Sequence, residues 1–252
     1  MINETNIELN LEILRSNNTS FYTFQPIFET IDSTNTYIKN NLISLENKSV
    51  ILAKYQTKGR GRYDRNFVSN NDKGIYCSFL LKENLHFSLL NLKIACALHH
   101  SIKETFNINT YIKWPNDLMI NNKKCAGILI ETQFNQTNLE AIIIGFGLNI
   151  FKQKFDTELE RTAISLEEYK NQTYNRNKLL NTFFNKLDYF LSQNDTIGYF
   201  RNHMIPKETF VNLTINNAKE IVKIIDLNSE GQLIVETKNN EILTLFNEEI
   251  SL

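Results

Sequence analysis

The segment EAIIIGFGLNI, residues 140–150, constrains the fold more than any other part of the chain. Nearly every position in it is apolar, so a strand formed there is covered on both faces and cannot lie at the edge of a sheet. The chain must therefore place neighbouring strands on both sides of it. Further apolar runs predict strands at residues 21–31, 49–55, 75–81, 109–114, 117–120 and 125–132.

Helices are expected between these strands. Residues 87–106 and 175–193 have the length and the apolar face of long packed helices. A shorter helix is expected at residues 196–204, and another over residues 32–42, where Asp32 or Ser33 provides the cap. Strands and helices thus alternate along most of the chain.

The pattern changes after Pro206. Short apolar runs separated by turn residues predict strands at residues 209–215, 220–227, 231–237 and 241–246. Such runs are typical of a small all-β barrel. We therefore expect one domain at residues 1–205 and a second at residues 206–252.

Composition and charge argue against several classes of protein. The formal net charge of −1 over 252 residues gives no general attraction to nucleic acid or to anionic membranes. No apolar run reaches membrane-spanning length, and the N-terminal sequence has neither the basic start nor the apolar core of a signal peptide. Cys77, Cys96 and Cys125 lie far apart in apolar surroundings, which indicates reduced core thiols. A cytoplasmic globular protein is expected.

Glycine is scarce, and its placement is informative. Five of the eight glycines fall in three short segments: Gly59 and Gly61, then Gly127, then Gly145 and Gly147. Because glycine has no side chain, this concentration indicates places where the backbone turns tightly or approaches another group closely.

The first of these segments lies in a polar loop, residues 56–74, which carries Lys58, Arg60, Arg62 and Arg65. Arginine provides forked donors with a permanent charge, and glycine-rich backbone offers N–H groups to an anion. A loop of this composition can fold over a carboxylate or a phosphate. Taken alone, such a loop is more often a solvated basic segment of the surface.

Further motifs give this loop a context. They are DSTN at residues 32–35, GRGR at 59–62, KWPND at 113–117, KKCAGILIE at 123–131 and GFGLN at 145–149. In this order and at these intervals they resemble the motifs of the biotin–protein ligases, the enzymes that attach biotin to carboxylases. The resemblance runs from about residue 28 to the C-terminus, where EEISL is similar to the family's GEISL. One departure is Phe67, because the family usually has tryptophan there, against the adenine.

The resemblance implies an α+β fold and an adenylating reaction. In that family a catalytic domain related to class II aminoacyl-tRNA synthetases, built on a mixed and largely antiparallel sheet, precedes a small SH3-like β-barrel. Biotin attacks the α-phosphate of ATP, supplied with Mg²⁺, to give biotinyl-5′-AMP and pyrophosphate. A lysine of a biotin carboxyl carrier protein or domain then takes the biotinyl group. The match is to the monofunctional type, without a DNA-binding domain.

The resemblance also implies catalytic roles. Lys124 stands at the family's essential lysine, where its charge would stabilise the α-phosphate, whereas Lys123 occupies a variable position. Arg62 matches the arginine that contacts the biotin carboxylate and the activated phosphate. Asp117 is expected to hold Mg²⁺ directly, to hold it through water, or to orient Lys124.

Two sets of ligand-binding residues follow from the same resemblance. The biotin-binding set is Ser33, Thr34, Asn35, Gln56, Gly59, Arg60, Gly61, Arg62 and Gly127. The set for ATP and the adenylate is Arg62, Arg65, Phe67, Asn116, Asp117, Lys124 and Asn149. From spacing alone, Ser33 and Thr34 indicate only a helix cap.

Three other functions compete with this one. A lipoate–protein ligase is another adenylating enzyme on a related fold, but its family carries a triple glycine that does not occur here. A transcriptional regulator would need a DNA-binding helix-turn-helix, and only 31 residues precede Asp32. A non-catalytic biotin-binding or regulatory module would not need Lys124. DNA and membranes are therefore not expected as partners, while the family's homodimers make a homodimer one alternative to a monomer.

Overall fold

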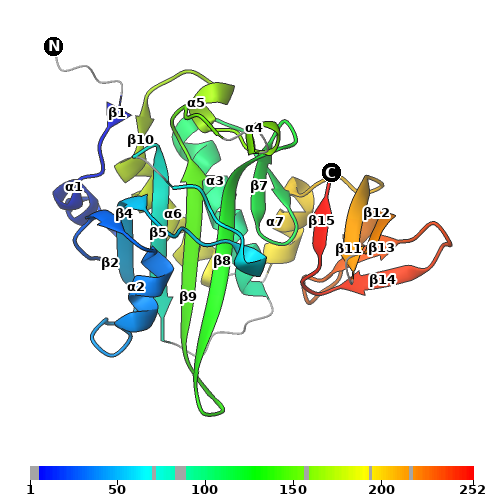
Figure 1. The fold of residues 1–252 in the computed structure, drawn as a ribbon, viewed down its shortest axis with the longest axis horizontal. Coiled ribbons are helices and arrows are strands. Elements are labelled where there is room, and N and C mark those ends of the chain that lie inside the picture. Colours follow the sequence, from blue (N-terminus) through cyan, green and yellow to red (C-terminus); the bar gives the residue numbers. More distant parts are fainter. Residues whose placement is uncertain (1–5, 70–71, 83–88, 156–158, 193–194, 216–217) are drawn as a thin grey trace.

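The computed structural model describes residues 6–69, 72–82, 89–155, 159–192, 195–215 and 218–252. Within these ranges the chain forms an eight-stranded mixed sheet with helices on both faces and a separate five-stranded antiparallel sheet (Figure 1). This arrangement confirms the α+β class and the mixed sheet expected from the sequence. No helix in the described ranges is long and apolar enough to cross a membrane. Cys77, Cys96 and Cys125 are buried and free, as expected.

β9 (Asn138–Asn149) is an interior strand, as its apolar sequence predicts. It pairs antiparallel with β5 (Gly74–Leu81) on one side and with β8 (Lys123–Asn135) on the other. The full order is β2 (Thr23–Phe24), β4 (Ser49–Gln56), β5, β9, β8, β7 (Asp117–Ile120) and β6 (Tyr111–Lys113), with β3 (Phe28–Ile31) also paired to β4. β2 and β3 run parallel to β4, and the other pairs are antiparallel.

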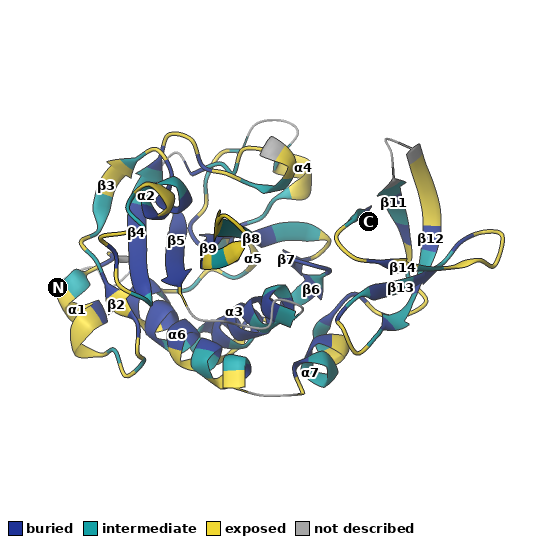
Figure 2. Ribbon diagram, turned by 90° about the horizontal axis from the view of Figure 1, so that it is seen from below, coloured by how far each residue is buried: buried dark blue, intermediate teal, exposed yellow. Residues whose placement is uncertain are grey.

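Alternation along β9 divides the core between the two faces of the large sheet. Ile144 belongs to the main core together with α3 (Leu90–Phe106) and α6 (Arg176–Ser192). Its neighbour Ile143 belongs to a smaller cluster with α2 (Thr34–Asn40). Successive side chains of a strand point to opposite faces, so α3 and α6 cover one face and α2 lies on the other. Figure 2 shows β4, β5 and much of α3 and α6 as buried.

Helix α2 begins where the sequence predicts, and its cap is Ser33, not Asp32. The Ser33 hydroxyl oxygen accepts a hydrogen bond from the Thr36 N–H at 3.5 Å. The Asp32 carboxylate accepts from the Ser33 N–H at 2.6 Å. This start places Thr34 and Asn35 in the first turn, where both are buried.

The sequence pattern does not predict several short elements. These are β1 (Asn6–Ile7), α1 (Leu11–Ser16), α4 (Leu159–Thr162), α5 (Leu166–Tyr169) and β10 (Tyr174–Asn175). The single strand expected at residues 21–31 is wrong, because β2 and β3 are separate strands. Pro26 lies between them and has no N–H to donate to a ladder.

The second sheet follows α7 (Thr196–His203). Its strands are β11 (Phe210–Ile215), β12 (Ala218–Leu227), β13 (Leu233–Glu236), β14 (Ile242–Leu245) and β15 (Glu249–Ser251), in the order β14, β13, β12, β11, β15. Four of them overlap the predicted strands, and β15 is additional. The indole Nε1 of Trp114 donates to the Gly231 carbonyl at 3.0 Å, so the turn before β13 is fastened to the end of β6.

Candidate active site

A cavity of about 440 Å³ opens on the α2 face of the large sheet. The register of the strands sets the residues of its floor. One cross-strand row holds Asp117, Gly127 and Gly147, and the next holds Leu129, Gly145 and Ser78. Further along the same face of β9, Ile143 packs beneath α2. The face thus changes from isoleucine to glycine where the cavity begins.

The glycines of β9 make room for other parts of the chain. A Cβ atom on Gly147 would lie 2.3 Å from the Phe67 ring, and one on Gly145 would lie 2.2 Å from Oδ1 of Asn35. Both distances are far shorter than any real contact of a side chain. The close approach expected from the glycine pattern is therefore confirmed at these two positions.

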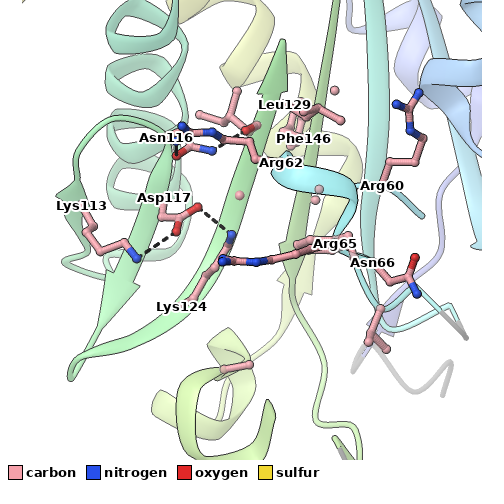
Figure 3. Close-up of a pocket in the computed structure, with 18 of the residues that line it drawn as sticks. Arg60, Arg62, Arg65, Asn66, Lys113, Asn116, Asp117, Lys124, Leu129 and Phe146 are labelled. Atoms are coloured by element: carbon pink, nitrogen blue, oxygen red, sulfur yellow. Dashed lines mark hydrogen bonds and ion pairs between the residues drawn. The ribbon is translucent and has the colours of Figure 1, made fainter. Parts of the chain in front are cut away.

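Lys113, Asp117 and Lys124 form a charge cluster around the buried Asp117 carboxylate at one end of the cavity (Figure 3). Oδ1 of Asp117 lies 2.6 Å from Nζ of Lys124, and Oδ2 lies 3.2 Å from Nζ of Lys113. Burial raises the pKa of Asp117, but the ammonium groups of Lys124 and Lys113 outweigh burial and hold the pKa below its ordinary value. Asp117 is therefore a carboxylate that fixes two cations beside the cavity.

This arrangement does not suit Asp117 as a direct ligand of Mg²⁺, because each of its oxygens already lies within ion-pair distance of a lysine. In the part of the chain that the structure describes, no group of three or more His, Cys, Asp or Glu side chains is placed to hold a metal ion. Mg²⁺ commonly binds through one or two carboxylates together with substrate phosphates. The residues present suit an ion that arrives on phosphate oxygens.

The arginine loop, residues 57–69, folds back on itself beside this cluster. The Phe67 N–H donates to the Gly59 carbonyl at 2.9 Å, and the Gly61 N–H donates to the Arg65 carbonyl at 2.7 Å. The Arg62 guanidinium donates to Oδ1 of Asn116 at 3.1 Å (Figure 3). The loop therefore holds one arginine over the turn between β6 and β7.

The second sheet also reaches this loop. Arg62 donates to the backbone carbonyl of Asn247 and, at 2.8 Å, to its side-chain oxygen. Arg65 forms a two-pronged ion pair with Glu249, with nitrogen–oxygen distances of 2.5 and 2.6 Å. Both arginines are thus held by residues from the last part of the chain, and Glu249 lines the cavity.

The other end of the cavity has a polar floor of connected side chains. The Arg60 guanidinium forms an ion pair with the Glu131 carboxylate at 2.9 Å, and Nδ2 of Asn35 donates to Glu131 at 2.8 Å. The Ser78 hydroxyl donates to Oδ1 of Asn35 at 2.5 Å, and its oxygen lies 2.6 Å from the Thr34 hydroxyl oxygen. Gln56 Oε1 then accepts from the Thr34 N–H at 2.8 Å. Each of these side chains except Glu131 lines the cavity.

The structure brings nearly all of the predicted site residues to this one cavity. Its walls include Ser33, Thr34, Asn35, Gln56, Arg60, Gly61, Arg62, Arg65, Phe67, Asn116, Asp117, Lys124, Gly127 and Asn149. Gly59 is the exception, because it lies inside the folded arginine loop and does not line the cavity. The Asn149 amide nitrogen donates to the Ile164 carbonyl at 3.3 Å, which holds this residue at the rim.

Sequence reasoning missed several residues of the site. They are Lys113, Ser78, Glu131, Asn247 and Glu249. Lys113 and Glu131 stand within the recognised motifs, so their charge between apolar residues is a usable signal. Ser78 lies in a strand that is buried throughout, so no alternation of polarity marks it.

Comparisons with known proteins agree with this geometry. A model of the biotin/lipoate A/B protein ligase family matches residues 27–149. The bifunctional ligase/repressor BirA of Bacillus subtilis (strain 168) is 29% identical over 215 residues, which cover 81% of this chain and 66% of that protein. The biotin–[acetyl-CoA-carboxylase] ligase of Paracoccus denitrificans is 31% identical over 123 residues, 47% of this chain and 51% of that protein.

A solved structure extends the likeness to most of the fold. The biotin protein ligase from Aquifex aeolicus in complex with biotin and ATP has a TM-score of 0.79 and 25% identity, and the match covers 92% of this chain and 98% of that one. The match to the biotin/lipoate A/B protein ligase family over residues 27–149 confirms the resemblance seen in the sequence. The chain spans less than two thirds of the length of the Bacillus and Paracoccus relatives.

Proposed function

We propose that the chain is a biotin–[acetyl-CoA-carboxylase] ligase, which activates biotin as biotinyl-5′-AMP and transfers it to a lysine of a biotin carboxyl carrier protein or domain. The observation that carries this proposal is the gathering of Lys113, Lys124, Arg62 and Arg65 around one cavity with a buried polar floor. A carboxylate and a polyphosphate repel each other, so a site that joins them must supply positive charge. The names of the matched ligases support the choice of biotin and ATP.

The first step joins the two anions. A carboxylate oxygen of biotin attacks the α-phosphorus of ATP, a new P–O bond forms, and the bond to the bridging oxygen breaks as pyrophosphate leaves. Lys124 is the group that stabilises charge developing on the α-phosphate, because its ammonium stands at the cavity wall. Asp117 acts as a positioning residue, since it holds that ammonium at 2.6 Å. Mg²⁺ enters as part of the ATP complex and neutralises phosphate charge.

The arginine loop serves the same step. Arg62 spans from the loop to Asn116 and Asn247, so its guanidinium is held over the cavity. In this position it can pair with the biotin carboxylate and then with the adenylate phosphate, while Arg65 serves the phosphates of ATP. In the second step the amine of the acceptor lysine attacks the acyl carbon of biotinyl-5′-AMP, and AMP leaves.

The proposal includes the finer architecture. Residues 1–205 are the catalytic domain, with the fold of class II aminoacyl-tRNA synthetases, and residues 206–252 are an SH3-like barrel. The mixed sheet beneath the cavity and the five-stranded antiparallel sheet support this division. The carrier domain is the protein partner. A cytoplasmic location, the absence of DNA binding and the choice between monomer and homodimer stay predictions.

The test is a biotinylation assay with purified chain, biotin, Mg·ATP and a biotin carboxyl carrier domain, read by intact mass. We expect the carrier to gain one biotinyl group. Lys124→Ala should slow adenylation about 100-fold or more, because it removes the cation at the phosphate. Its matched control is Lys123→Ala, whose amine contacts the Glu160 carbonyl outside the cavity. Equal pyrophosphate release with biotin and with lipoate would contradict the assignment.

A further inference from the structure

The polar floor of the cavity has a fixed direction of hydrogen bonding, and this direction bears on the choice of substrate. Its starting point is Glu131. One carboxylate oxygen of Glu131 pairs with Arg60 at 2.9 Å, and the other accepts from Asn35 at 2.8 Å. A carboxylate in an ion pair can only accept hydrogen bonds. The Asn35 carboxamide must therefore turn its NH₂ group to Glu131 and its oxygen away from it.

The Asn35 side-chain oxygen determines the direction in which the Ser78 hydroxyl donates its hydrogen. Ser78 Oγ lies 2.5 Å from Oδ1 of Asn35, which can only accept, so Ser78 donates its one hydroxyl hydrogen there. Ser78 Oγ also lies 2.6 Å from the hydroxyl oxygen of Thr34. Since the hydrogen of Ser78 is already used, Ser78 can only accept from Thr34 in this second contact.

The other neighbour of Thr34 leads to the same result. Oε1 of Gln56 accepts from the Thr34 N–H at 2.8 Å, which fixes the Gln56 carboxamide with its oxygen towards Thr34. This oxygen lies 3.1 Å from the Thr34 hydroxyl and is again an acceptor. Whether it points to Ser78 or to Gln56, the hydrogen of Thr34 is used inside the protein. The hydroxyl therefore offers only lone pairs to the cavity.

We propose that Ser78, Asn35 and Glu131 act together as positioning residues that make the Thr34 hydroxyl a hydrogen-bond acceptor and so select an acid whose ring carries an N–H donor. The inference rests on the proposed function and deepens it. A cyclic urea brings two N–H groups, whereas the dithiolane ring of lipoate brings none. Thr34 is 4% exposed, so a ligand that covers it without a donor leaves its oxygen unsatisfied. This loss corresponds to about tenfold or more in affinity.

The test compares biotin with its cyclic carbonate analogue, in which both ring N–H groups are oxygen. The Kd of each acid is measured by calorimetry for the full chain, Thr34→Val, Ser78→Ala and the double variant, and the KM for ATP is measured in parallel. The wild-type chain should bind biotin about tenfold or more tightly than the carbonate. The ratio of the Kd for the carbonate to the Kd for biotin should fall towards one in Thr34→Val. It should fall by a smaller amount in Ser78→Ala.

Because Ser78 acts through Thr34, Ser78→Ala should have no further effect on biotin binding in the Thr34→Val background. The KM for ATP should stay unchanged in these variants. The matched control is Ser49→Ala, which removes another fully buried strand serine, outside the cavity, and should leave the ratio intact. The wild-type ratio and Thr34→Val decide the question even if Ser78→Ala fails to fold.

Two results would overturn the inference and leave the proposed function standing. One is equal affinity of the wild-type chain for biotin and the carbonate. The other is that Ser78→Ala weakens the binding of both acids equally, and that its effect on biotin binding adds in full to the effect of Thr34→Val. A wild-type chain that binds no biotin would overturn the proposed function as well, so the two failures are distinguishable.

Discussion

The guanidinium of Arg65 and the carboxylate of Glu249 face each other in a two-pronged ion pair, although 184 residues separate them in the sequence. The pair joins the arginine loop to β15, beside the contact of Arg62 with Asn247. At the end of β6, the hydrogen bond from Trp114 to the Gly231 carbonyl fastens the turn before β13 to the large sheet. The second sheet is therefore tied to the candidate active site at two places.

The ion pair itself should add little to stability. The Arg65 side chain is 62% exposed, and solvent screens such pairs strongly. A double-mutant cycle with Arg65→Ala and Glu249→Ala, measured by urea unfolding, should give a coupling of about 1 kcal/mol or less. The pair would then serve to place Arg65 at the cavity. A coupling of several kcal/mol would instead show that the ion pair holds the two sheets together.

Gly127→Ala should disturb Lys124 with little effect on the fold. The added Cβ would lie 2.6 Å from Cε and 2.7 Å from Nζ of Lys124, so the end of this flexible side chain must move. Adenylate formation should slow by about tenfold or more, because a cation displaced by an ångström loses much of its effect on the transition state. The measurement is single-turnover formation of the adenylate, with the melting temperature as the check on folding.

Gly198→Ala provides a matched control for this substitution. There the new Cβ would also meet the end of a side chain, 2.6 Å from the carboxylate of Asp195, but away from the cavity. Adenylation should be unchanged. If the two variants slowed the reaction alike, the effect of Gly127→Ala could not be ascribed to Lys124.

The Asp117 carboxylate should give the chain a pH-dependent stability. Its folded pKa lies below the ordinary 3.8, so the charge cluster stabilises the folded state above that pH, and the benefit is lost as the pH falls through the lowered pKa. At pH 7, Asp117→Asn should cost roughly 1–3 kcal/mol of unfolding free energy, because Lys113 and Lys124 lose their shared partner. The difference from wild type should shrink below about pH 3.8.

The same variant should slow adenylation, because the Lys124 ammonium is no longer held. Asp226→Asn is its control, since Asp226 also pairs with two cations, Arg201 and Lys207, but lies outside the cavity. Adenylation should be unaffected there. A stability difference for Asp117→Asn that stayed constant down to pH 2.5 would contradict the charge cluster as the cause.

Much of this site can be predicted from the sequence, because the signals come from residue types within short segments. The position of β9 inside the sheet follows from its apolar residues, and the close approach at Gly147 follows from a glycine where isoleucine would otherwise stand. Lys124 and Asp117 stand out through their motifs. These features depend on short stretches of chain, so the residues themselves carry the signal.

The rest depends on contacts that no local pattern contains. Glu249 reaches Arg65 only because β15 returns alongside β11, and β15 has three residues, too few to show a strand pattern. Ser78 shares its row with Gly145, but only the register of β5 against β9 reveals this. Long-range pairing of this kind is set by the packed fold as a whole, so it becomes visible only in three dimensions.

The last prediction concerns the arginine loop as a cover of the intermediate. Arg62 links this loop to Asn116 at 3.1 Å and to Asn247 at 2.8 Å, so its side chain closes one side of the cavity. Arg62→Ala should leave the fold intact, slow adenylate formation and let bound biotinyl-5′-AMP escape, because both a charge partner and a barrier to water are lost. The measurement is the lifetime of pre-loaded adenylate after dilution, beside single-turnover adenylation.

Lys58→Ala is the control, because Lys58 is an exposed cation of the same loop that does not line the cavity. It should keep the wild-type lifetime. Lys124→Ala separates the two roles of charge, since it should slow adenylation with less effect on escape. If Arg62→Ala retained the adenylate as long as the wild-type chain does, the contacts of Arg62 would fix only the position of the loop, and protection of the intermediate would have to come from other walls of the cavity.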